Sequence, residues 1–206
     1  IVVSAKDGVE SGTEKAVKLV NHKKIPTIFF VNKMDEENAS FDKVYGDLRE
    51  KFGKAVIPFE VPIIDNGVVK GSINVLRKKA WYYDDRTTAK EVPADYTDIV
   101  EEYYMQIAEA IAMADDELME KFFSGEQFNE DELAKGLRIG VRNGEIKPVY
   151  CGSAVNCVGI ERLLDLITEY FPNYAEKGTV VALDADNEEV ILETNETEAF
   201  SAQVFK

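Results

Sequence analysis

The feature that most constrains the fold is an unbroken run of β-branched and aromatic residues, 27–31 (TIFFV), that ends abruptly in the polar loop 32–35 (NKMD). A continuous run of this kind is typical of a strand that is buried on both faces of a parallel sheet. Ligands of such sheets bind beyond the carboxyl ends of the strands, where residues 32–35 fall. The sequence therefore predicts an α/β fold with a binding loop at this position.

The side chains of this loop fit guanine. A carboxylate such as that of Asp35 can accept two hydrogen bonds at once, from the ring N–H and the exocyclic amine of guanine, whereas adenine offers no such pair. The methylene stem of Lys33 can lie along the purine face, and the Asn32 amide can brace the loop and reach the base edge. Two hydrogen bonds to a charged partner, at roughly 1.5–3 kcal/mol each, would favour guanine by about two orders of magnitude or more. The alternative is a polar turn in which the aspartate caps a helix.

A second segment repeats the arrangement. Residues 146–150 (IKPVY) lead into 151–154 (CGSA), and apolar residues at helical spacing follow: Ile160, Leu163, Leu164, Ile167 and Phe171. A loop of small residues lets a backbone N–H approach a ligand closely, and guanine O6 is an acceptor where adenine has a donor. The alternative is an ordinary strand-to-helix turn with a serine cap. Together the two loops predict a guanine site formed by Asn32, Lys33, Asp35, Ser153 and Ala154.

Several spaced segments now resemble one family, the translational GTPases of the elongation factor G type. They are 9–13 (VESGT), 25–26 (IP), 29–35, Pro58, 115–119 (DDELM), 148–149 (PV) and 151–154. The resemblance runs in order from Ile1 to about Pro172, and residues 199–206 resemble the opening strand of the family's next domain. One departure is Glu36, because the family usually has an arginine directly after its N-K-M-D motif; this predicts a diverged member.

The resemblance implies a partial P-loop-GTPase-type parallel sheet, with strands near 1–4, 27–31 and 146–151, and an inserted α/β subdomain. Asp35 and Ser153 lie 118 positions apart, from 35 to 153, whereas one βαβ step needs only ~30 residues or more. The implied domains are the C-terminal half of a GTPase (G) domain at 1–53 and 146–172, the inserted subdomain at 54–145, and a linker with the first strands of a β-barrel domain at 173–206.

Inside the insert, apolar and polar residues alternate over 61–75, and turn signals occur at 65–67 and 70–71. This pattern predicts antiparallel strands and a hairpin. A long amphipathic helix is predicted from about Ala94, and a second one is predicted to be capped at 129–132 and to stop at 143–144. Before the first loop, 11–14 (SGTE) predicts a capping box that starts a helix.

The catalytic half of a GTPase site is missing from this sequence. The phosphate-loop motif G-x-x-x-x-G-K-[ST] does not occur; its nearest imitation, Gly53-Lys54, is followed by alanine. An Asp-x-x-Gly segment and a convincing Mg²⁺-binding threonine are also missing, and phosphoryl transfer depends on positioning phosphate and Mg²⁺. We expect a piece of a longer protein that recognises GTP or GDP, with Mg²⁺ bound by other residues of the parent, and no measurable GTP hydrolysis by this chain alone. Its first strand would have an open edge, which favours self-association.

The composition limits the classes of partner and the cellular compartment that we expect. A net charge of −15 argues against direct nucleic-acid binding, and no apolar stretch approaches the ~20 residues that span a bilayer. The two cysteines, 151 and 157, lack matching ligands for a metal and fit a reduced, cytoplasmic protein. The resemblance implies action on the ribosome, with the helices of the insert docking a protein of the ribosomal stalk.

Three hypotheses remain open at this stage. The first is an elongation factor G-like translational GTPase, and the second is a ribosomal-protection or release-factor-type GTPase with the same guanine loops. The third is a non-catalytic interaction module whose nucleotide loops are inherited but unused. The residues leave open whether the parent acts in translocation, in recycling or in another step.

Overall fold

A computed structural model describes residues 1–173, 179–184, 186–195, 197, 200 and 202. These residues fall into two compact units, 1–171 and 172–206, and each unit is described by itself. The expected strand at 199–206 lies almost wholly outside the described residues.

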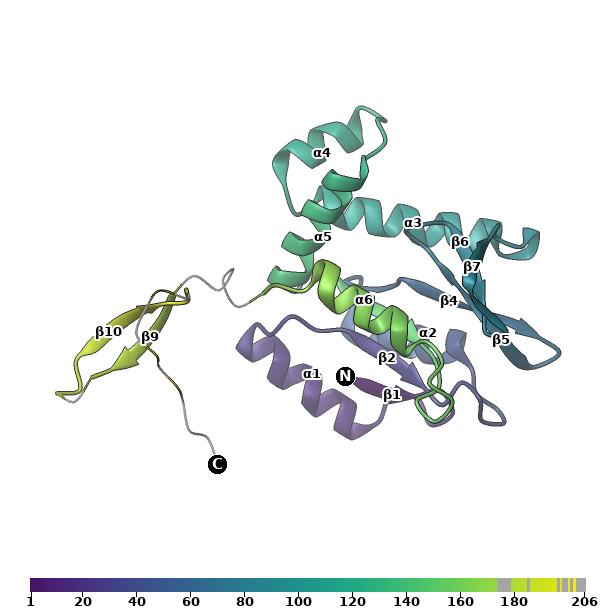
Figure 1. The fold of residues 1–206 in the computed structure, drawn as a ribbon, viewed down its shortest axis with the longest axis horizontal. Helices are drawn as coiled ribbons and strands as arrows, with labels where there is room; N and C mark the ends of the chain where they lie inside the picture. The colour runs from purple at the N-terminus through teal and green to yellow at the C-terminus, as the bar shows by residue number, and fades with distance from the viewer. Residues whose placement is uncertain (174–178, 185, 196, 198–199, 201, 203–206) are drawn as a thin grey trace. The chain divides into compact units, whose positions relative to one another are not determined.

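The first unit is built on a four-stranded parallel sheet in the order β1-β2-β8-β3. Figure 1 labels two neighbouring strands of this sheet, β1 and β2. The three predicted strands are present and adjacent, and β1 lies at the edge, which confirms the α/β fold class. Phe29 and Val31 are fully buried and Phe30 is 5% exposed, as the continuous apolar run predicts. A fourth strand, β3, was not predicted; it pairs with β8 although it falls within the range assigned to the insert. The strands are β1 (Val2–Ser4), β2 (Phe29–Asn32), β3 (Val56–Pro58) and β8 (Lys147–Cys151).

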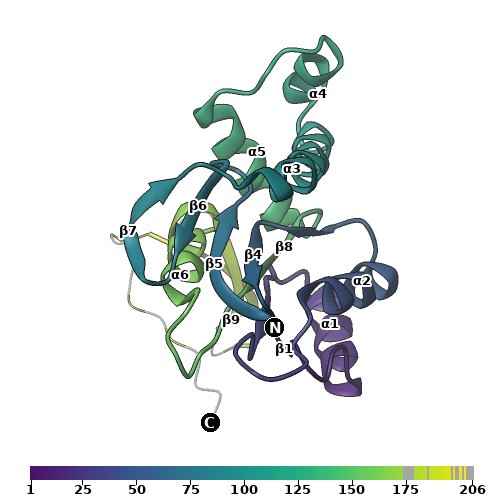
Figure 2. The same ribbon diagram turned by 90° about the vertical axis from the view of Figure 1, so that its right-hand side faces the viewer.

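Three helices flank this sheet. Figure 2 shows α1 and α2 on one side of it and α6 on the other. The Lys51 ammonium lies 2.6 Å from the Glu14 carboxylate and joins α2 to α1. Their bounds are α1 (Ser11–Lys23), α2 (Phe41–Phe52) and α6 (Ile160–Tyr170).

Two details of these helices differ from the prediction. The capping box at 11–14 is wrong: Ser11 is already helical, the N-cap residue Glu10 makes no side-chain cap bond, and Glu14 is used by Lys51. In α6 the fully buried residue is Leu166, at 1% exposure, and three residues of the predicted stripe, Ile160, Leu163 and Phe171, pack partly buried against the core, whereas Leu164 and Ile167 are 56% and 42% exposed. The apolar stripe of α6 is therefore wider than the face that the sheet covers.

An antiparallel sheet follows in the order β4-β5-β6-β7. The chain enters it directly from β3 through Phe59, whose N–H donates to the Val149 carbonyl at 2.9 Å. The predicted hairpin turn at Asn66-Gly67 is confirmed, with positive φ at both residues. The strands are β4 (Glu60–Asp65), β5 (Val68–Asn74), β6 (Lys79–Tyr82) and β7 (Asp85–Lys90).

The second turn signal, at 70–71, is wrong. Both residues lie inside β5, where the register with β4 shifts by one residue, so the site is a β-bulge. A Cβ on Gly71 would lie 2.3 Å from the Trp81 carbonyl oxygen, which explains why glycine stands there: the neighbouring strand passes too close for a side chain.

Three helices complete the first unit: α3 (Thr97–Ala112), which follows a 3₁₀ turn at Ala94–Tyr96, α4 (Asp116–Phe123) and α5 (Glu130–Asn143). The predicted helix cap at 129–132 is confirmed and is a capping box of Asn129 and Glu132, and α5 stops at 143–144 as predicted, with Gly144 in the left-handed conformation. None of the helices in the described part of the chain is long and apolar enough to cross a membrane. In the second unit, β9 (Thr179–Leu183) and β10 (Glu189–Glu193) form an antiparallel pair.

Helix α5 approaches its neighbours through two glycines. A Cβ on Gly136 would lie 2.3 Å from Cγ2 of Ile111 and 2.9 Å from Cδ1 of Leu118, and a Cβ on Gly140 would lie 2.6 Å from Cδ1 of Ile146. These three partners are buried to 3% exposure or less. The small residues therefore allow α5 to pack tightly on α3, α4 and the start of β8.

We expect Gly136→Ala to lower the free energy of unfolding by about 1–3 kcal/mol, because the new methyl group overpacks a filled core. Urea denaturation measures this change. Gly46→Ala is the matched control: Gly46 is an exposed residue inside α2 with nothing within 4 Å of its Cβ position. The Gly46→Ala substitution should raise the free energy of unfolding by about 0.5–1 kcal/mol. Equal stabilisation of both variants would contradict the close packing of α5.

Candidate functional site

The carboxyl ends of β1, β2 and β8 meet at one edge of the parallel sheet. Ser4 pairs with Asn32 across β1 and β2, and Val31 pairs with Cys151 across β2 and β8. The loops that follow β2 and β8 therefore start side by side. This register brings residues 32–35 next to residues 152–154.

Two hydrogen bonds join the two predicted loops, and a third joins the second loop to the end of β2. The Ala154 N–H donates to Oδ1 of Asn32 at 2.9 Å, the Met34 N–H donates to the Gly152 carbonyl at 3.1 Å, and the Gly152 N–H donates to the Val31 carbonyl at 3.0 Å. The Met34 side chain is only 4% exposed and anchors the first loop in the core. The loops thus behave as one structural element.

The second loop is itself closed by a short antiparallel bridge. Ser153 and Val158 exchange backbone hydrogen bonds of 3.0 and 2.9 Å. A Cβ on Gly152 would lie 2.1 Å from the Val158 carbonyl oxygen, so only glycine permits this closure. Gly159, at φ +77°, then directs the chain into α6.

Ser153 lies beneath the loop surface. It is 3% exposed, its N–H donates to Val158, and its Oγ accepts from the Asn156 N–H at 3.3 Å. Ala154 is exposed, and its N–H points to Asn32. Of the two N–H groups that the sequence offered for guanine O6, the one at Ala154 is closer to solvent, and a ligand would share it with the Asn32 amide.

The charged side chains of the first loop remain at the surface. Asp35 is exposed, and among the described residues its carboxylate has no hydrogen bond or ion pair. Lys33 adopts the left-handed conformation at φ +66°, and its ammonium lies 3.3 Å from the Glu36 carboxylate. Glu36 also faces Lys6 at 3.8 Å.

The loop after β1 belongs to the same edge, and sequence reasoning missed it. The Ala5 N–H donates to the Asn32 carbonyl at 2.8 Å, and the Ala5 carbonyl accepts from the Ser40 N–H at 2.9 Å. Lys6 follows directly and reaches Glu36. The family's sheet order implies that β1 and β2 are neighbours, and this adjacency could have predicted that the loop after β1 lies at the same edge.

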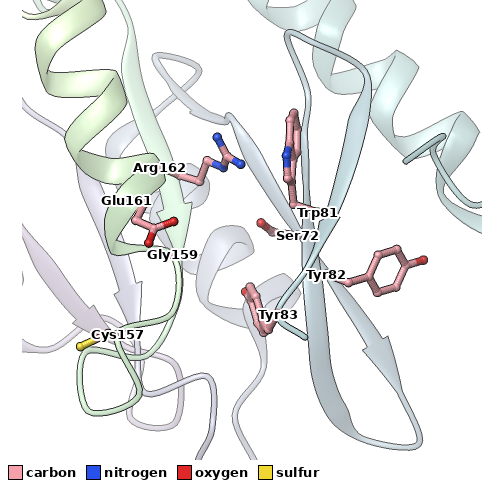
Figure 3. Close-up of a pocket in the computed structure, with 8 residues that line it drawn as sticks. All are labelled: Ser72, Trp81, Tyr82, Tyr83, Cys157, Gly159, Glu161 and Arg162. Carbon is pink, nitrogen blue, oxygen red and sulfur yellow. The ribbon is translucent and has the colours of Figure 1, made fainter. Parts of the chain in front are cut away.

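Behind the second loop, α6 packs on the antiparallel sheet. The Arg162 guanidinium lies 4.2 Å from the centre of the Trp81 ring (Figure 3). The hollow between them has a volume of about 30 Å³, which suits a single water and no larger ligand. Close by, burial raises the pKa of the Glu60 carboxyl, and hydrogen bonds from Ser72 and Asn74 oppose that rise. This region supports the loops and offers no second ligand site.

Within the described ranges no three His, Cys, Asp or Glu side chains come together as metal ligands. The chemistry of the edge is that of a hydrogen-bonding surface: the Asp35 carboxylate, the Ala154 N–H that the Asn32 amide accepts, and the Lys33 ammonium.

Residues 1–173 match the family model described as the elongation factor Tu GTP binding domain. The chain belongs to this family. Over all 206 residues it is 36% identical to an elongation factor G-like protein of Thermotoga maritima and spans 30% of that protein's length. A crystal structure of a protein from Thermus thermophilus superposes with a TM-score of 0.78 at 31% identity, covering 87% of this chain and 27% of that one. The predicted assignment to the translational GTPases of the elongation factor G type is confirmed.

Loss of the Asn32 amide should loosen the second loop. In Asn32→Ala we expect the Ala154 N–H to exchange with solvent roughly two- to ten-fold faster, since a hydrogen bond of this kind contributes about 0.5–1.5 kcal/mol. Hydrogen exchange followed by NMR measures the rate. Asn156→Ala, which removes another exposed asparagine side chain from the same loop, should leave the rate unchanged; unaltered exchange in Asn32→Ala would contradict the bracing role.

Proposed function

We propose that residues 32–35 and 152–154 form the guanine-recognition part of an elongation factor G-like translational GTPase. The observation that carries this proposal is the hydrogen bond between Asn32 and Ala154, two residues 122 positions apart. It joins the two predicted loops at one sheet edge, where the Asp35 carboxylate is exposed and has no hydrogen bond or ion pair among the described residues.

The assigned roles follow from the chemistry of each group. Asp35 accepts hydrogen bonds from N1–H and the exocyclic amine of guanine, and the Ala154 N–H donates to O6. Asn32 holds Ala154 through Oδ1, while its Nδ2 can donate to the base edge. The stem of Lys33 covers the purine face, and Ser153 shapes the loop from beneath.

Phosphate and Mg²⁺ contacts belong to other residues of the parent protein under this proposal. The 206 residues contain no phosphate-loop motif, so base contacts alone hold the nucleotide. We expect dissociation constants of roughly millimolar, which corresponds to about −4 kcal/mol. The parent would hydrolyse GTP on the ribosome in the cytoplasm, with residues 1–53 and 146–172 as the second half of its G domain, 54–145 as an insert and 173–206 as the start of its next domain.

We further propose that helices α3 to α5 carry the docking face for a basic protein, with the ribosomal stalk as the partner that the family resemblance implies. These helices and their connections expose a set of acidic side chains: Glu101, Glu102, Glu109, Asp116, Glu117, Glu120, Glu126, Glu130 and Asp131. The same surface repels nucleic-acid phosphates. Complementary charge favours fast association with a basic partner.

Asp35→Asn tests the base assignment. The amide replaces one acceptor by a donor, so it opposes the guanine amine and matches xanthine, which carries a carbonyl oxygen at the same position. We expect GDP to bind about ten- to a hundred-fold more weakly and xanthosine diphosphate to bind better than GDP. NMR titrations with GDP, xanthosine diphosphate and ADP give the three dissociation constants.

Glu37→Gln is the matched control for this prediction. Glu37 is an exposed carboxylate two positions further on, with no hydrogen bond or ion pair among the described residues. It should retain the preference for GDP over ADP. A wild-type chain that binds GDP and ADP equally, or an Asp35→Asn variant with unchanged preference, would show that the loops do not recognise guanine.

A further inference from the structure

We propose that Glu36 is a positioning residue that keeps the Asp35 carboxylate open for guanine by holding the ammonium group of Lys33. This inference rests on the proposed guanine site. Glu36 is the glutamate that directly follows the N-K-M-D motif of residues 32–35.

The contacts of the loop carry the inference. Lys33 Nζ lies 3.3 Å from Glu36 Oε1, and Lys6 Nζ lies 3.8 Å from Glu36 Oε2. The backbone supports the pairing, because the Glu36 N–H donates to the Lys33 carbonyl at 3.1 Å and so closes a tight turn. Glu36 is thus the shared anion between two ammonium groups from two different loops.

Asp35 would be the next acceptor for the Lys33 ammonium. The two residues are two positions apart in one exposed loop, and the lysine side chain has a flexible four-carbon stem. If the ammonium moved to Asp35, it would occupy the oxygens that guanine needs and would draw the stem away from the purine face. In the structure the ammonium is paired with Glu36 instead, and Asp35 has no ion pair among the residues that the structure describes.

Removal of the Glu36 charge should affect guanine recognition in the opposite direction from the one that simple electrostatics predicts. Removing a negative charge near a nucleotide site should strengthen the binding of anionic GDP and ADP alike. If Glu36 protects Asp35, its removal weakens guanine recognition specifically. The ratio of the ADP and GDP dissociation constants separates the two effects, because both nucleotides carry the same phosphates.

The test uses Glu36→Gln in the 206-residue chain, with NMR titrations of GDP and ADP. Since exposed ion pairs contribute about 0.2–1 kcal/mol, we expect the preference for GDP over ADP to fall roughly two- to five-fold. Glu37→Gln should leave the preference unchanged. In a Lys33→Met background, which has no ammonium to misplace, Glu36→Gln should have no effect on the preference.

A second readout is independent of nucleotide binding. The Glu36→Gln substitution should shift the side-chain carboxyl ¹³C resonance of Asp35 in the wild-type background. In the Lys33→Met background the same substitution should leave that resonance in place. An unchanged or stronger GDP preference in Glu36→Gln, with an unmoved Asp35 resonance, overturns the inference while the guanine site stands. A wild-type chain without GDP preference overturns the proposed function, and the Asp35 resonance then decides alone whether Glu36 holds Lys33.

Discussion

The parallel pairing of β2 with β8 is the constraint on which the site depends. It places the ends of two strands at the same level, although about half of the chain lies between them. The hydrogen bond from Ala154 to Asn32 can form only because that register is fixed. A one-residue slip would turn the buried Phe29 and Val31 out of phase with their layers, so the same apolar side chains that build the core also align the polar loops.

Close backbone approach is the second recurring theme. Gly152 and Gly159 let the second loop fold back on the end of β8, where any Cβ would lie within 2.3 Å of a carbonyl oxygen. Gly71 allows β6 to approach the bulge of β5, and Gly136 seats α5 on α3 and α4. Each glycine lies where a neighbouring segment occupies the space of a side chain, so the loops are supported by tightly packed surroundings.

Local sequence signals predicted the parts of this fold that depend on short-range chemistry. The TIFFV run, the Asn66-Gly67 turn and the Asn129–Glu132 capping box needed no distant partner to be recognised. The predictions that were wrong or missing all depend on a partner that is distant in the sequence. Strand β3 has only three residues and is defined by β8, the glutamate of the expected box at 11–14 is held by Lys51 of another helix, and Gly71 serves a bulge that only the β4 register reveals.

The candidate site shows the same division. The hypothesis of a guanine site rests on the residue types at Asn32, Lys33 and Asp35, whereas the buried position of Ser153 depends on its bridge to Val158. The most direct test of the account is an NMR titration of the ¹⁵N-labelled chain with GDP and, separately, with ADP. The account predicts that GDP shifts the amide signals of residues 32–36 and 152–155 at concentrations where ADP does not. Equal shifts with both nucleotides, or shifts confined to other elements, would contradict it.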